Sequence, residues 1–220
     1  MRTWKTLVGV WLLSIIVLAG CANDADRAYR ETFDAPGNWR TGTDTDAEGV
    51  IDEGVFDFLV KADNLVTWTT AGESFTDGIY ELEATQVEGS LNNGYGMLLR
   101  TNDEQDNFYL FEISGDGYVW IGRYRRGGEE EAEPLVGDWW FESDAVNQGL
   151  DNTNRLRVRV EGGNFIFFVN DIEVGRFSDD AFASGDIGLL VRTLGEGGVR
   201  VEFDNFNVTP LDSVPVPPSN

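Results

Sequence analysis

Residues 94–124, GYGMLLRTNDEQDNFYLFEISGDGYVWIGRY, contain three runs in which apolar and other side chains alternate, separated by TNDEQD and SGDG. Alternation with a period of two places successive side chains on opposite faces of a strand, and short runs rich in Gly, Asn and Asp close hairpins. The stretch therefore predicts three consecutive antiparallel strands, at 94–101, 107–114 and 118–125.

The same alternation recurs through the rest of the chain. It predicts further strands at 55–61, 78–88, 154–161, 164–169, 172–177, 186–192 and 198–208, with one possible helical turn at 178–184. Strands that follow strands at this spacing are typical of two antiparallel sheets packed face to face. The fold class expected is all-β, an antiparallel two-sheet sandwich.

The hairpin lengths set the register of the strands. TNDEQD places Gly96 beside Glu112, and SGDG places Glu112 beside Trp120. If the segment 89–93 also closes a hairpin, the strand 78–88 pairs with 94–101 and brings Glu83 onto the same face as Glu112. The opposite face is then the core face, with Tyr80, Leu82, Ala84, Tyr95, Met97, Leu99, Tyr109, Phe111, Ile113, Val119 and Ile121.

The face that carries Glu112 combines aromatic, charged and glycine residues. An unpaired carboxylate in the core costs several kcal/mol, so Glu112 is expected to point away from the core. Aromatic rings offer flat apolar surface to the C–H faces of a sugar, and Glu and Arg hydrogen-bond hydroxyls. The predicted carbohydrate-binding residues are Glu112, Trp120, Arg100, Tyr118, Tyr124 and Phe108.

Two simpler interpretations of this face remain open. Arg100 can form a cross-strand ion pair with Glu81 and bind nothing else. Trp120 can also be covered by a loop of the protein itself, for example the segment with Trp139 and Trp140, in which case no sugar would bind there.

The N-terminus has the pattern of an export signal. Arg2 and Lys5 precede an apolar run, Leu7–Leu18, that is shorter than the roughly 20 residues of a membrane-spanning helix. The following Leu-Ala-Gly-Cys resembles the bacterial lipobox, which implies lipidation of Cys21. We therefore expect a signal peptide at 1–20, a lipid-anchored tether at 21–30, a sandwich domain at 31–208 and a disordered Pro-rich tail at 209–220, in an exported protein anchored to the cell membrane or envelope.

Composition excludes several functions. A formal net charge of −23 excludes nucleic acid as a partner, because contacts with phosphates would be repulsive. The absence of histidine excludes Ser-His-Asp and Cys-His catalysis and histidine-ligated zinc. The expected partners are an oligosaccharide or polysaccharide and, through Cys21, the membrane.

Four stretches, NNGYGMLLRTNDEQDNFYLFEISGDGYVWIGRY, NRLRVRVEGGNFIFFVNDIEVGRF, FASGDIGLLV and VRVEFDNFNV, resemble the concanavalin A-like lectin/glucanase superfamily. They are more closely similar to laminin G-like and 3-keto-disaccharide hydrolase-type domains. The resemblance covers residues 30–208 and implies a jelly-roll with ligand on its concave sheet. The Glu-x-Asp-x-x-Glu stretch of the glucanase branch is not matched, because Glu81-Leu-Glu83-Ala-Thr85-Gln86 lacks the Asp and the final Glu.

The resemblance also implies a structural calcium that ties the N-terminal segment to the last strand. Asp204 in VEFDNFNV stands at the position of its carboxylate ligand, and Asp34 and Gly54 lie in regions that supply the rest. Calcium binds six to eight oxygen ligands, and carbonyls and water commonly complete the set.

Three functions follow from these patterns. The first is a non-catalytic, lectin-like carbohydrate-binding protein. The second is a glycoside hydrolase or lyase of the 3-keto-disaccharide hydrolase type, with Glu83 and Glu112 as its acid and base, since paired carboxylates are what glycoside cleavage requires. The third is a structural or adhesion module that binds protein.

Overall fold

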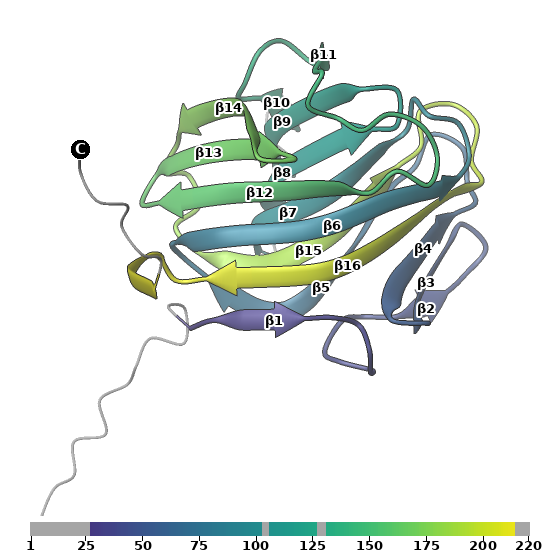
Figure 1. The fold of residues 1–220 in the computed structure, drawn as a ribbon, viewed down its shortest axis with the longest axis horizontal. Helices are drawn as coiled ribbons and strands as arrows, with labels where there is room; N and C mark the ends of the chain where they lie inside the picture. The colour runs from purple at the N-terminus through teal and green to yellow at the C-terminus, as the bar shows by residue number, and fades with distance from the viewer. Residues whose placement is uncertain (1–26, 103–105, 127–130, 214–220) are drawn as a thin grey trace, which may run out of the picture.

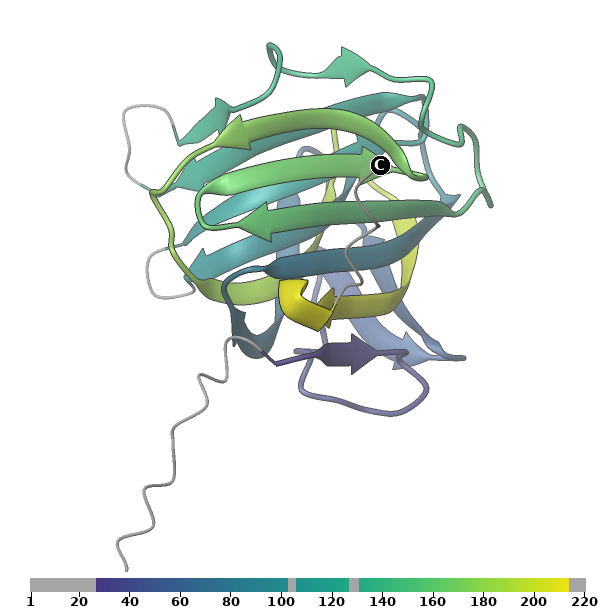
Figure 2. The same ribbon diagram turned by 60° about the vertical axis from the view of Figure 1, so that its left-hand side comes forward.

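The computed structural model describes residues 27–102, 106–126 and 131–213, which form two antiparallel sheets packed face to face (Figures 1 and 2). In this part of the chain, sheet A holds β1 (Tyr29–Glu31), β2 (Gly42–Thr43), β3 (Ala47–Asp52), β4 (Val55–Val60), β6 (Gly78–Glu88), β12 (Asn154–Glu161), β13 (Asn164–Val169), β14 (Ile172–Ser178) and β16 (Val199–Thr209). Sheet B holds β5 (Val66–Phe75), β7 (Gly94–Asn102), β8 (Asn107–Ser114), β9 (Tyr118–Arg125), β10 (Ala132–Pro134), β11 (Phe141–Glu142) and β15 (Gly185–Arg192). The all-β sandwich expected from the sequence is confirmed.

All ten predicted strands are present, with ends that differ by at most one residue. The possible helical turn at 178–184 is not present, because Ser178 ends β14 and irregular chain follows. The longest strand that the sequence analysis missed is β5. Its residues Thr69, Thr70 and Ala71 are all buried in succession, so the strand lacks the alternation on which the prediction depended.

The core lies between the sheets, and every residue predicted for the core face is buried there. The local register predictions are confirmed as well: Gly96 pairs with Glu112 in β7 and β8, and Glu112 pairs with Trp120 in β8 and β9. Glu112 therefore points away from the core, as expected.

The predicted pairing of 78–88 with 94–101 is wrong. The strand β6 lies in sheet A between β12 and β16, and segment 89–93 crosses from one sheet to the other. The amide side chains of Gln86 and Asn93 both donate to the carbonyl of Ser90, at 2.9 and 2.7 Å, and so stabilise this crossing. As a result Glu81 and Glu83 lie on the outer face of sheet A.

The first and last strands of the domain are neighbours, since β1 pairs with β16. Tyr29 and Arg30, predicted as part of the tether, are thus part of sheet A. β1 begins and the final turn Leu211–Ser213 ends at the same side of the molecule (Figures 1 and 2). Cys21 and the predicted signal peptide lie outside the described residues, among which no helix has the length and apolar character to cross a membrane.

Candidate functional site

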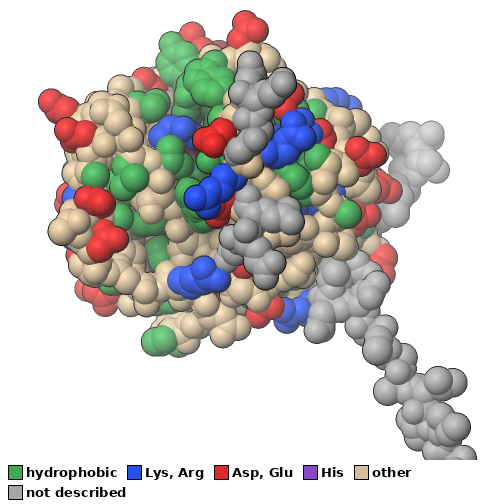
Figure 3. Space-filling view, turned by 180° about the vertical axis from the view of Figure 1, so that it is seen from behind, with side chains coloured by type: hydrophobic (Ala, Val, Ile, Leu, Met, Phe, Trp, Pro, Cys, Tyr) green, Lys and Arg blue, Asp and Glu red, His purple; other side chains and the backbone are tan. Residues whose placement is uncertain are grey.

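The outer face of sheet B carries a row of side chains that crosses five strands. Successive cross-strand partners are Trp68, Leu190, Gly96, Glu112 and Trp120. Four strand spacings of about 4.8 Å make this row about 19 Å long. Figure 3 shows this side of the molecule, where apolar and basic side chains reach the surface and acidic ones gather mainly around the rim.

Glu112 and Arg192 form a buried ion pair at the centre of this face. Glu112 is 0% exposed, and its two carboxylate oxygens accept hydrogen bonds from Nε and Nη2 of Arg192 at 2.9 and 2.8 Å. The guanidinium also lies over the ring of Trp120, 5.1 Å from its centre. Burial opposes the charge on Arg192, but the charge and hydrogen bonds of Glu112 outweigh that effect and raise the pKa of Arg192 above its usual value.

The residues Leu135–Glu142 cover Trp120. The rings of Trp139 and Trp140 lie 5.0 and 6.4 Å from that of Trp120, which is only 1% exposed. Gly94 makes room for this arrangement, because a Cβ there would overlap the carboxylate of Glu112 and approach the Trp140 ring to 2.9 Å. The predicted open groove above Glu112 and Trp120 is therefore closed in this conformation, by the segment that the sequence analysis named as the alternative.

Arg100, predicted for this face, lies elsewhere. The register shifts between Leu99 and Asn102, and Arg100 adopts a positive φ of 53°, which turns its side chain away from the outer face. The guanidinium is buried, donates to the carbonyls of Phe182 and Gly162 at 2.8 and 2.9 Å, and lies 5.0 Å from the centre of the Phe165 ring. Arg100 thus ties loops to the core, and its predicted ligand role is wrong.

The predicted aromatic residues differ in exposure. Phe108 is buried beneath Tyr124, whose ring stacks on it at 5.0 Å, while Tyr118 is 38% exposed at the start of β9. Trp139 is 49% exposed, with Trp120 as its support. Sequence analysis regarded Trp139 only as a cover, whereas the structure also makes it an exposed aromatic surface.

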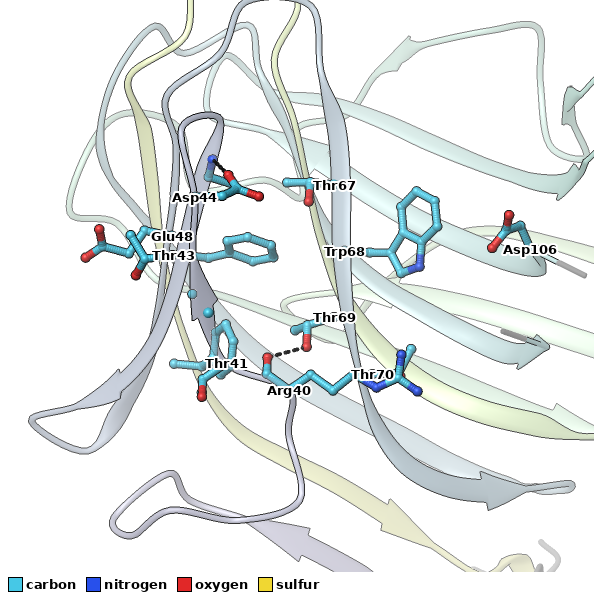
Figure 4. A pocket seen from close by; sticks show the side chains of 15 residues that line it. Arg40, Thr41, Thr43, Asp44, Glu48, Thr67, Trp68, Thr69, Thr70 and Asp106 are labelled. Atoms are coloured by element: carbon cyan, nitrogen blue, oxygen red, sulfur yellow. Dashed lines mark hydrogen bonds between the residues drawn. The ribbon is translucent and has the colours of Figure 1, made fainter. Parts of the chain in front are cut away.

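A cavity of about 430 Å³ opens along the outer edge of β5, between that edge and the strands β2, β3 and β4 (Figure 4). Its lining combines the rings of Phe56, Phe58 and Trp68 with the hydroxyls of Thr41, Thr43, Thr67, Thr69 and Thr70 and the charged groups of Arg40, Asp44, Glu48 and Asp106. An apolar floor with several polar groups is the usual composition of a small-molecule site.

Trp68 links this cavity to the rest of the face. Its ring packs edge-on against Phe108 at 5.5 Å and is only partly buried. Figure 4 shows Trp68 projecting from β5 toward Asp106, with Asp44 and Glu48 on the opposite side of that strand. Sequence analysis missed the cavity because it arises from β5 and the β2–β3 hairpin, which were not predicted as strands.

The cavity's carboxylates are each bound by a partner. Asp44 accepts hydrogen bonds from the backbone N–H groups of Ala47 and Asp46, which lower the pKa of Asp44 below its usual value. Glu48 pairs with Lys61 at 3.3 Å, and Asp106 pairs with Arg126. The lowered pKa favours the ionised form of Asp44, which accepts hydrogen bonds.

The predicted acid–base pair of Glu83 and Glu112 is not assembled. Glu83 lies on the outer face of sheet A and Glu112 on that of sheet B, so the whole sandwich separates them. Glycoside cleavage requires two carboxyl groups within about 10 Å. The predicted acid–base pair was wrong because it depended on a hairpin at 89–93, whereas this segment crosses from one sheet to the other.

The residues predicted for calcium lie near one another, with Asp204 in β16 and with Asp34 and Gly54 in turns beside sheet A. A Cβ at Gly54 would contact Oδ1 of Asp34 at 3.5 Å. The charge of the Asp34 carboxylate in turn contributes to the raised pKa of Asp204. Burial, with the charges of Glu83 and Asp34, raises the pKa of Asp204 despite an opposing backbone hydrogen bond from Asn205. No three acidic or cysteine side chains gather as metal ligands within the described residues, so backbone carbonyls and water would have to supply most of the ligands.

Comparison with known proteins identifies the fold. No family model and no curated protein matches the sequence. Among solved structures, the carbohydrate-binding module CBM66 from Bacillus subtilis aligns with a TM-score of 0.62 at 17% identity, over 79% of this chain and 96% of that one. A β-glucanase from Bacillus licheniformis aligns with a TM-score of 0.59 at 11% identity, over 83% of this chain and 97% of that one. The Crh5 transglycosylase in complex with NAG aligns with a TM-score of 0.60 at 11% identity, over 85% of each chain. The chain has the concanavalin A-like jelly-roll fold.

Proposed function

We propose that this protein is a non-catalytic carbohydrate-binding domain whose ligand occupies the cavity beside β5 and extends over the outer face of sheet B toward Trp139. The observation that carries the proposal is the cavity itself, which is lined by the Trp68 ring and Asp106 on one side of β5 and by Thr67, Thr69, Asp44 and Glu48 on the other (Figure 4). Aromatic rings and fixed acceptors are the groups that recognise sugar rings and hydroxyls. The structural similarity to a carbohydrate-binding module and to a β-glucanase supports a saccharide ligand.

The state of the carboxylates favours binding over hydrolysis. A glycosidase needs one carboxyl group that is protonated at working pH, which requires a raised pKa. In the cavity, Asp44 has a lowered pKa and the carboxylates of Glu48 and Asp106 are held in ion pairs. The lowered pKa keeps Asp44 in the form that accepts hydrogen bonds, and Glu48 and Asp106 already have cationic partners.

The protein is further proposed to be exported and held at the membrane by lipid on Cys21. The Leu18-to-Cys21 stretch behind a complete signal sequence supports this proposal. Lipid chains would anchor the domain at its N-terminal side, close to β1. Mass spectrometry of the N-terminal peptide tests it: diacylated Cys21 is expected, and an unmodified cysteine would refute it.

Substitution of Trp68 tests the binding proposal. Isothermal titration with β-1,3-1,4-glucan fragments and with N-acetylglucosamine oligosaccharides is expected to show binding that Trp68→Ala weakens at least tenfold. Trp68→Phe should restore much of the affinity, because a ring remains. A matched control, Ile172→Ala, removes an exposed apolar side chain from the far edge of sheet A and should have no effect. Equal affinity of Trp68→Ala and wild type, or no binding of either saccharide, would refute the proposal.

A further inference from the structure

The outer face of sheet A carries a second, smaller pocket, on the side of the sandwich opposite the proposed saccharide site. It has a volume of about 290 Å³ and lies where β1, β6, β12 and β16 run next to each other (Figure 1). Its lining consists of Arg30, Glu81, Leu82, Glu83, Arg155, Asn205 and Asn207. It contains no aromatic side chain, so it lacks the flat apolar surface that sugar rings prefer.

A β-bulge in β16 shapes one wall of this pocket. The register shifts between Asp204 and Asn207, and Asn205 adopts a positive φ of 52°. The amide nitrogen of Asn205 donates to Glu83 Oε2 at 2.9 Å, and that of Asn207 donates to the carbonyl of Asn205 at 2.8 Å. The wall therefore holds two side-chain amides, of which that of Asn205 contacts the Glu83 carboxylate.

Opposite charges stand at opposite ends of the pocket. Cross-strand pairing runs from Arg30 to Asn207 and then to Glu81, so two strand spacings, or about 10 Å, separate the backbones at the two charged residues. In the part of the chain that the structure describes, Glu81 forms an ion pair only with Arg155, at 4.0 Å, the outer limit for such a pair. Within the described residues no carboxylate lies in ion-pair distance of Arg30, which is unexpected in a chain with net charge −23.

The acidic end carries surplus negative charge. Glu83 is the direct cross-strand partner of Asp204, and like charges in that position repel each other. Arg155, the nearest cation, is shared with Asp171 outside the pocket. A positively charged group between Glu81 and Glu83 would offset this repulsion.

We propose that this pocket binds a small zwitterion such as a free α-amino acid, with the ligand's carboxylate at Arg30 and its ammonium group at Glu81 and Glu83. The uncharged Asn207 lies between the two ends and accepts a hydrogen bond from the ligand. The volume suits a molecule of amino-acid size, and the separated charges disfavour both simple anions and simple cations. The inference is independent of the proposed saccharide site.

Titration of the mature protein with free L- and D-amino acids, together with their amides and N-acetyl derivatives, tests the inference. At least one free amino acid is expected to bind, and either amidation or acetylation should weaken its binding at least tenfold. Arg30→Gln and Glu81→Gln should each cause a similar loss while the circular dichroism spectrum is unchanged. Arg159→Gln, on the same face but outside the pocket, and Trp68→Ala, at the saccharide site, should bind as wild type.

Three outcomes would overturn the inference. The first is the absence of binding by every free amino acid at about 10 mM, roughly ten times the dissociation constant of a weak site. The others are undiminished binding by Arg30→Gln and equal binding of the blocked derivatives. A variant that loses saccharide binding but keeps amino-acid binding, or the reverse, would show that the two sites are independent.

Discussion

At the scale of single residues, Glu112 shows how a carboxylate is accommodated in the middle of an apolar strand. Desolvation of an isolated charge costs several kcal/mol, but Arg192 satisfies both carboxylate oxygens and is itself supported by the Trp120 ring. Gly94 supplies the space that the pair needs. The acid therefore has a structural partner that the sequence analysis did not identify.

We predict that Glu112→Gln lowers the free energy of unfolding by about 3 kcal/mol, because it leaves the largely buried guanidinium of Arg192 without a counterion. Guanidinium chloride denaturation measures the change. The double variant Glu112→Leu with Arg192→Met should recover most of the loss, since it removes both charges. A Glu112→Gln protein as stable as wild type would show that the pair contributes no net stability.

Asp204 gives a second prediction at this scale. Because its folded-state pKa is raised by burial, Glu83 and Asp34, the protonated form favours folding, and this contribution is lost as pH rises through the folded-state pKa. In chelator at pH 7, Asp204→Asn should therefore melt at a higher temperature than wild type.

In calcium, wild type is expected to melt at a higher temperature than Asp204→Asn. If the ion binds as the family resemblance implies, 5 mM calcium should raise the melting temperature of wild type, because a ligand that binds only the native state stabilises it. Asp204→Asn should show a much smaller increase. Equal responses of both proteins to calcium would contradict a role for Asp204 as a ligand.

At the scale of elements, the segment Leu135–Glu142 determines what the outer face of sheet B presents. Trp120 and Glu112 are buried because this segment lies over them, held to β9 at its ends by β11 and by the bond from the Leu135 N–H to the carbonyl of Ile121. The exposed surface passes to Trp139 instead. The covering segment thus buries Trp120 and exposes Trp139 at the surface.

Substitution of Trp140 with alanine should expose Trp120 to solvent. Loss of the covering ring is expected to shift tryptophan emission to longer wavelength, increase quenching by acrylamide and lower the stability by about 3 kcal/mol. Trp139→Ala is the matched control, and it should cost less because half of that side chain is already exposed. A Trp140→Ala protein with unchanged quenching would show that other contacts suffice to bury Trp120.

At the scale of the whole molecule, the net charge of −23 opposes compaction. Many acids are offset locally, as the arginine ladder of β12 shows: Arg155 and Arg157 pair with Asp171, and Arg159 pairs with Glu161. The remaining acids repel one another over distances comparable to the Debye length.

We therefore predict that the melting temperature rises by several degrees between 10 and 300 mM NaCl, a range over which the Debye length falls from about 30 Å to less than 8 Å. Differential scanning calorimetry of wild type measures the change. A fall in the melting temperature with added salt would mean that the attractive ion pairs, which salt also screens, outweigh the repulsion.

The sequence by itself determined the strands and the pairing within hairpins, because side-chain alternation and turn residues act between neighbours in the chain. Glu112 beside Gly96 and Trp120 is such a local result. Only the tertiary structure decided which sheet β6 joins, which loop covers Trp120 and where the cavity beside β5 opens. Those features depend on contacts between segments far apart in the chain, whose free energies no local pattern records.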